Sequence, residues 1–151
     1  MVSPELIRRF PIFSGLTMEQ IISLAKAADE LEVERDHYFH HEGEELNALY
    51  ILLDGEVTIV SKLPEREREI TIHTLGAGDV FGWSAFVPPY AATAGAKAVT
   101  RCKVIVFDAI ELRKEFEADC QFGYVMMQKI ALIIRDRLNT LRIETLAYSA
   151  G

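Results

Sequence analysis

The feature that most limits the fold of this chain is a change of hydrophobic period near Leu31, from helical spacing to alternation. From there to Phe107, short runs suited to β-strands follow one another, at 31–33, 38–40, 49–53, 56–62, 69–75 and 96–107. Turn signals rich in glycine, proline and aspartate, such as Asp54-Gly55, separate most of these runs. Closely spaced short strands favour an antiparallel roll, barrel or sandwich over a parallel sheet.

Helical spacing is found on both sides of this β region. It covers Pro4 to Phe10 and Thr17 to Asp29, and it returns after Asp108 and holds to the C-terminus. The predicted fold is mainly β with flanking helices, an antiparallel, jelly-roll-like β-roll with N-terminal helices and a long C-terminal helix. We expect residues 1–151 to form a single domain, with N-terminal helices at 1–30, the roll at 31–108 and C-terminal helices at 109–151.

One insertion interrupts the strands. Val80 to Phe86 has the pattern of a strand end that passes into a single helical turn, and Pro88-Pro89 terminates that turn. This is the only such insertion that the sequence predicts in the roll.

Three stretches in this order resemble the cyclic-nucleotide-binding domain of the catabolite activator protein and protein kinase A regulatory subunit superfamily. They are Phe10–Leu16, with the sequence FPIFSGL, Leu49–Val57, with LYILLDGEV, and Gly76–Gly82, with GAGDVFG. The last leads into the family's phosphate-binding cassette, which corresponds to residues 80–93. The resemblance implies the β-roll fold, a regulatory role and a cyclic nucleotide as the ligand.

Two positions of the cassette depart from the family pattern. The Glu that accepts a ribose hydroxyl is replaced by Trp83, and the position of the phosphate-binding Arg falls near Ala92. Loss of the Arg contact alone costs about 1.5–3 kcal/mol, so cyclic nucleotides are expected to bind weakly through the usual contacts. Lys97 and Arg101, on the following strand, offer a substitute cation only if they point inward. The candidate ligand-binding residues are Gly82, Trp83, Ser84, Ala85, Ala92 and Thr93.

The C-terminal helix carries apolar residues at alternating spacings of four and three. Such a heptad pattern indicates either a homodimer seam or a face that folds back on the roll. We favour the dimer. The predicted seam residues are Met127, Ala131, Ile134, Leu138, Leu141, Thr145 and Tyr148.

The predicted function is that of a non-catalytic regulatory module, which senses a small nucleotide or anionic ligand and signals through its C-terminal helix. A ligand-free domain that acts as a protein-interaction scaffold is the first alternative. The second is a cupin-like metalloenzyme that uses His37, His40, His41 and His73. Because His40 and His41 are adjacent in a strand, they face opposite sides and cannot both point into the roll, so we expect no metal site. We also expect no catalytic residues and no bound cofactor.

Composition narrows the partners. The net charge of −7 opposes direct nucleic-acid binding, since a DNA binder neutralises phosphates with clustered Lys and Arg. The acidic residues concentrate in residues 1–60, which indicates either a solvated acidic face, the alternative we favour, or a surface for a basic protein partner. We expect no membrane association and no DNA-reading module within these 151 residues. We also expect a cytoplasmic location, because the two cysteines form no disulfide or zinc pattern and suit a reducing compartment.

Overall fold

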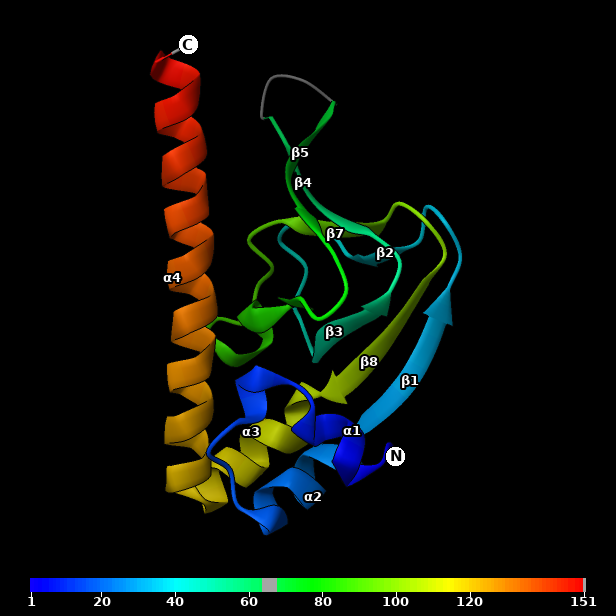
Figure 1. The fold of residues 1–151 in the computed structure, drawn as a ribbon, viewed down its shortest axis with the longest axis vertical. Helices are drawn as coiled ribbons and strands as arrows, with labels where there is room; N and C mark the ends of the chain where they lie inside the picture. Colours follow the sequence, from blue (N-terminus) through cyan, green and yellow to red (C-terminus); the bar gives the residue numbers. More distant parts are fainter. Residues whose placement is uncertain (64–67, 151) are drawn as a thin grey trace.

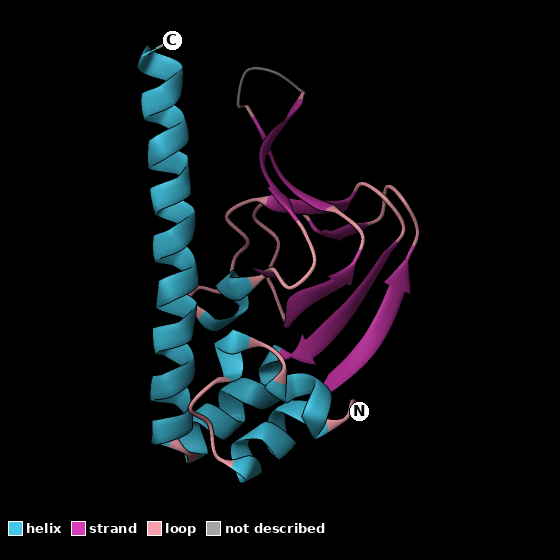
Figure 2. Ribbon diagram, in the orientation of Figure 1, coloured by secondary structure: helices cyan, strands magenta, loops and turns pink. Residues whose placement is uncertain are grey.

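The computed structural model describes residues 1–63 and 68–150. Short helices gather at one end, the strands form a roll beside them, and one long helix runs along both parts (Figures 1 and 2). The helical segments are α1 (Pro4–Arg8), η1 (Pro11–Phe13), α2 (Met18–Lys26), η2 (Trp83–Phe86), α3 (Ala109–Ala118) and α4 (Cys120–Ala150), of which η1 and η2 are 3-10 turns. The strands are β1 (Ala28–Val33), β2 (Tyr38–His40), β3 (Ala48–Asp54), β4 (Val57–Lys62), β5 (Glu69–Leu75), β6 (Val80–Phe81), β7 (Gly95–Ala98) and β8 (Cys102–Asp108).

The strands form two antiparallel sheets of four. One sheet has the order β1-β8-β3-β6 and the other β2-β7-β4-β5. Strand pairs such as β1 with β8 and β2 with β7 join segments that lie far apart in the sequence. The predicted β-roll with flanking helices and a long C-terminal helix is confirmed.

The first sheet is a wall between two hydrophobic cores. Side chains alternate across a strand, so Ile105 and Phe107 of β8 face the helices while Val104 faces the interior of the roll. β3 divides in the same way, with Ile51 on the helix side and Leu52 inside the roll. Because both faces are covered, these strands read as nearly continuous apolar runs.

The predicted strand at 96–107 is two strands in the structure. The break lies at Val99 to Arg101, where the Val99 amide donates to the Glu56 carbonyl over 2.9 Å and the Glu56 amide donates to Thr100 Oγ1 over 3.1 Å. This turn packs against the β3–β4 turn. The sequence does not show the break, because the contacts that stabilise it come from residues more than forty positions away.

α4 lies along the helical end and the roll. Its first turns bury Phe122, Met126 and Ile130 in the helix-side core, and Lys129 Nζ donates to Ser14 Oγ over 2.7 Å. Of the predicted seam, Ile134 packs on that core and Leu141 lines a cavity of the roll. The remaining seam residues are exposed, and they are Met127, Ala131, Leu138, Thr145 and Tyr148.

Candidate ligand-binding site

η2 begins at a glycine that no other residue replaces without strain. Gly82 has φ +80°, and a Cβ at this position would lie 2.9 Å from the Ala48 carbonyl oxygen. The left-handed backbone turns the chain out of β6 into the helical turn. Ala85 and Phe86 then anchor the turn in the helix-side core. The predicted strand end followed by one helical turn is therefore present, and buried side chains hold it in position.

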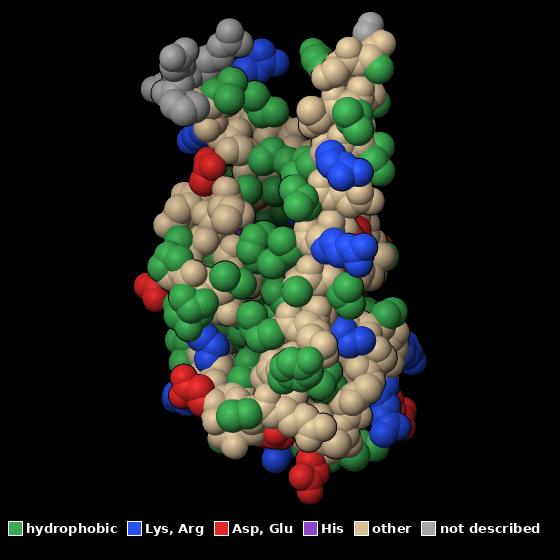
Figure 3. Space-filling model, turned by 90° about the vertical axis from the view of Figure 1, so that its left-hand side faces the viewer, with side chains coloured by type: hydrophobic (Ala, Val, Ile, Leu, Met, Phe, Trp, Pro, Cys, Tyr) green, Lys and Arg blue, Asp and Glu red, His purple; other side chains and the backbone are tan. Residues whose placement is uncertain are grey.

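A cavity of about 190 Å³ lies beside this turn, inside the mouth of the roll. Strands β2, β4, β5 and β6 contribute to its wall, together with η2, the segment before β7 and the middle of α4. Figure 3 shows hydrophobic side chains gathered in the hollow between α4 and the roll. The lining residues are His40, Leu46, Ile59, Ile72, Phe81, Gly82, Trp83, Ser84, Thr93, Ala94, Arg137 and Leu141.

The structure brings four of the six predicted ligand-binding residues to this cavity, namely Gly82, Trp83, Ser84 and Thr93. Ala85 is fully buried, and its amide donates to the Gly82 carbonyl over 3.0 Å. Ala92 is 4% exposed and packs in the helix-side core, and its amide donates to the Glu44 carbonyl over 2.8 Å. Ala85 and Ala92 therefore pack behind the cavity wall and do not line the cavity.

Trp83 takes the position where the family pattern has a carboxylate. The indole is half-buried, packs on the helix-side core and forms part of the cavity wall. It narrows the space beside η2 and replaces an acceptor by an apolar surface. The cavity therefore has no carboxylate at this position to accept a sugar hydroxyl.

Arg137 is a cation that lines the cavity from outside the cassette. It reaches the cavity from α4, and burial lowers the pKa of its guanidinium while nearby Asp79 opposes that shift. An arginine stays charged regardless. Within the described residues it makes no hydrogen bond or ion pair, so its donors are available to a ligand. The sequence prediction missed Arg137, although helical spacing from Ile130 and Ile134 places it on the roll-facing side.

His40 lies on the opposite strand wall and is also unpartnered. It is 6% exposed, and neither ring nitrogen has a hydrogen-bond partner among the described residues. Burial lowers the pKa of His40, an effect that the Ala94 backbone and Glu44 oppose. Alternation indicated that only one of His40 and His41 points inward, and the structure selects His40.

We expect His40 to make the fold less stable in mild acid. Because the pKa of His40 is lowered on folding, the unfolded chain takes up the proton first, and stability is lost as the pH falls below about 6.5. The loss is at most about 1.4 kcal/mol per pH unit. Urea unfolding at about pH 7.5 and 5.5 checks this. The His40→Leu variant should lose less stability than the wild type over this range.

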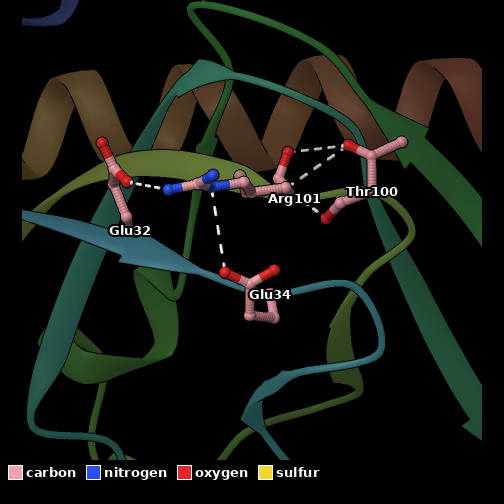
Figure 4. A network of polar contacts seen from close by, with 5 residues as sticks. Glu32, Glu34, Thr100 and Arg101 are labelled. Carbon is pink, nitrogen blue, oxygen red and sulfur yellow. Dashed lines mark hydrogen bonds and ion pairs between the residues drawn. The ribbon is translucent and has the colours of Figure 1, made fainter.

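The two basic residues of the following strands point away from the cavity. Arg101 Nη2 lies 2.6 Å from Glu32 Oε2 and its Nε lies 3.9 Å from Glu34 Oε1, on the outside of the roll (Figure 4). Lys97 lies 3.8 Å from Asp36 and 5.3 Å from the centre of the Tyr38 ring. Neither residue replaces the missing cassette arginine, because both are paired elsewhere.

The four histidines do not converge. His40 faces the cavity, His41 stacks on Tyr38 with ring centres 4.6 Å apart, and His37 packs edge-on against Phe39. His73 borders a different hollow, of about 500 Å³, between η1, β5 and α4. No group of three His, Cys, Asp or Glu side chains with metal-binding geometry occurs in the described part of the chain.

Together these features define a class of protein, a β-roll domain in which a strand-to-helix insertion and a long helix line one small cavity. The sequence profile of the cyclic nucleotide-binding domain matches residues 30–119. The chain belongs to the cyclic nucleotide-binding domain family.

The relatives include regulatory proteins. The CRP-like cAMP-activated global transcriptional regulator of Mycobacterium tuberculosis is 28% identical over 138 residues, which cover 91% of this chain and 61% of that regulator. A solved structure of a Geobacter metallireducens protein named for cyclic nucleotide binding is 28% identical, with a TM-score of 0.83, over 91% of this chain and 99% of that one. The sensor domain of the regulator DNR from Pseudomonas aeruginosa, at 20% identity, 89% and 90% coverage and a TM-score of 0.71, shares the fold.

Proposed function

We propose that this chain is a non-catalytic regulatory domain that senses a small nucleotide or other anionic ligand and transmits its occupancy through α4. One observation carries the proposal: η2 and α4 line the same cavity, so a bound ligand contacts both. A ligand that binds more tightly to one pose of α4 shifts the helix toward that pose.

The free cysteines, Cys102 and Cys120, suit a reducing compartment, and we propose the cytoplasm. No helix of the described residues is both long and apolar enough to cross a bilayer.

A thermal-shift screen tests ligand sensing. The panel contains cyclic AMP, cyclic GMP, cyclic dinucleotides and small organic anions. A ligand at about 100 times its dissociation constant stabilises the fold by roughly 2.7 kcal/mol, a shift of several degrees for a chain of this size. Hydrogen exchange then tests signalling: the amides of α4 near Arg137 should exchange more slowly with the ligand bound.

A ligand-free scaffold is the alternative that Trp83 and Ala92 favour, because they replace the two side chains that hold a cyclic nucleotide. This alternative predicts no thermal shift with any member of the panel. It also predicts that hydrogen exchange of α4 does not respond to added ligand.

We further propose that the exposed part of the heptad pattern on α4 joins two copies of the chain. Leu138 is 66% exposed and Tyr148 is 91% exposed, which leaves a row of apolar side chains uncovered in one copy. Sedimentation should give twice the single-chain mass of 17.0 kDa. The Leu138→Glu variant should have the molecular mass of a single chain in solution, because the substitution places two like charges in the seam. If Leu138→Glu leaves a dimer intact, the seam lies elsewhere.

A further inference from the structure

The size of the cavity limits what it can hold. Pockets that enclose drug-sized ligands have volumes of about 300–1,000 Å³, whereas this one has about 190 Å³. The side chains of Trp83, in η2, and Leu141, in α4, form part of the wall of this cavity. The space within these walls suits a ligand smaller than drug-sized ones, and Arg137 also borders the hollow of about 500 Å³ between η1, β5 and α4.

The polar groups of the cavity select charge. Arg137 is permanently cationic, and both nitrogens of His40 lack a partner although the side chain is more than nine-tenths buried. Unpaired polar groups in such a position are costly to bury. No Asp or Glu occurs among the lining residues of the described chain. An anion with two acceptor oxygens would accept a hydrogen bond from each of these groups.

Apart from Gly82 and the hydroxyl side chains of Ser84 and Thr93, the remaining wall is apolar. Seven side chains of this kind surround the polar pair, and they are Leu46, Ile59, Ile72, Phe81, Trp83, Ala94 and Leu141. An inorganic oxyanion would leave this surface without contacts. A carboxylate with a compact branched or aromatic body satisfies both the polar and the apolar parts of the wall.

We infer that the ligand of this cavity is a compact apolar monocarboxylate, held by Arg137 from α4 and His40 from β2. The inference rests on the proposed function and names its ligand class. The planar guanidinium of Arg137 suits a bidentate contact with a carboxylate. Because Arg137 belongs to α4, the contact with the ligand ties this helix directly to the roll.

Trp83 is the single tryptophan of the chain and lines the cavity, so its fluorescence reports binding. The full chain is titrated with isovalerate and phenylacetate and, in parallel, with isovaleramide and phenylacetamide. The amides match the acids in shape and lack the charge. We expect at least one acid to change the fluorescence of Trp83 saturably, and its amide to bind at least tenfold more weakly.

Variants on α4 and β2 test the two assigned residues. Arg137→Gln should weaken binding of the acid about ten- to a hundredfold, and Arg137→Lys should fall between this variant and the wild type. Arg135→Gln is the matched control, because Arg135 is exposed on the same helix, and it should bind as the wild type does. His40→Leu should also weaken binding, while His41→Leu should not. Circular dichroism checks that each variant is folded.

The outcomes distinguish a failure of this inference from a failure of the proposed function. Binding of an acid that depends on Arg137 supports both. A cyclic nucleotide that binds when neither acid does overturns the inference and leaves the proposed function standing. Binding of an acid that Arg137→Gln does not weaken overturns the role of Arg137. A flat response to acids, nucleotides and other anions overturns both and favours the scaffold.

Discussion

Replacing Phe107 with alanine is expected to lower the free energy of unfolding by about 3–5 kcal/mol. Phe107 is fully buried on β8, and its register partners are Ala28 of β1 and Leu49 of β3. Its ring centre lies 5.5 Å from that of Phe13 in η1, so one side chain ties the first sheet to the N-terminal segment. The smaller residue leaves a cavity that the surrounding strands fill only in part. Urea denaturation measures the loss, which is a large fraction of the stability of a typical domain.

The matched control for Phe107 is an exposed aromatic residue outside the proposed seam. Tyr124 in α4 is 65% exposed, and Tyr124→Ala should change stability by no more than about 0.5 kcal/mol. A loss below about 1 kcal/mol for Phe107→Ala would contradict the assignment of this ring to the helix-side core. Both variants are compared at a concentration where the oligomeric state is the same.

Gly82→Ala is expected to cost at least about 2 kcal/mol and to displace η2. The left-handed backbone at φ +80° alone penalises a side chain by about 1–2 kcal/mol. The new Cβ would also lie 2.9 Å from the Ala48 carbonyl oxygen, so β3 or the turn has to shift. Because Trp83 and Ser84 follow directly in the cavity wall, ligand binding should weaken together with stability. Thermal denaturation and the Trp83 fluorescence titration measure the two effects.

Gly78 separates the backbone effect from the close contact. It has φ +89°, and a Cβ there would meet nothing within 4 Å. Gly78→Ala should therefore show only the backbone penalty, of about 1–2 kcal/mol, and should leave the cavity unchanged. If the two alanine variants were equally stable and bound the ligand equally well, the close approach to Ala48 would have no energetic role.

The position of Arg137 connects the proposed ligand site with the proposed output helix, α4. In the resemblance-based prediction the cation of the site belongs to the cassette, at the position of Ala92. In the structure the cation available to a ligand is Arg137, on the helix that the proposal makes the output. Recognition of charge and movement of α4 would then depend on the same side chain.

Local sequence determined most of the secondary structure. Strand limits at Tyr38–His40 and Glu69–Leu75 match the predicted runs, because alternation and turn residues are properties of neighbouring positions. The capping box of α2 is also local, with Thr17 Oγ1 accepting from the Gln20 amide and Gln20 Oε1 accepting from the Thr17 amide. The resemblance likewise follows from short ordered stretches, and it predicts Gly82 and Trp83 at the candidate site.

Only the tertiary structure decided which side chains meet in the cavity. His40 and Arg137 are separated by nearly one hundred residues, and the packing of α4 along the roll brings both to the lining of one cavity. The same packing turns Leu141 inward and leaves Leu138, three residues earlier, exposed. A heptad pattern alone does not distinguish these two positions, because both are apolar and a helix can bury either face. The direction of that face is a long-range property, and it depends on the surface against which the helix packs.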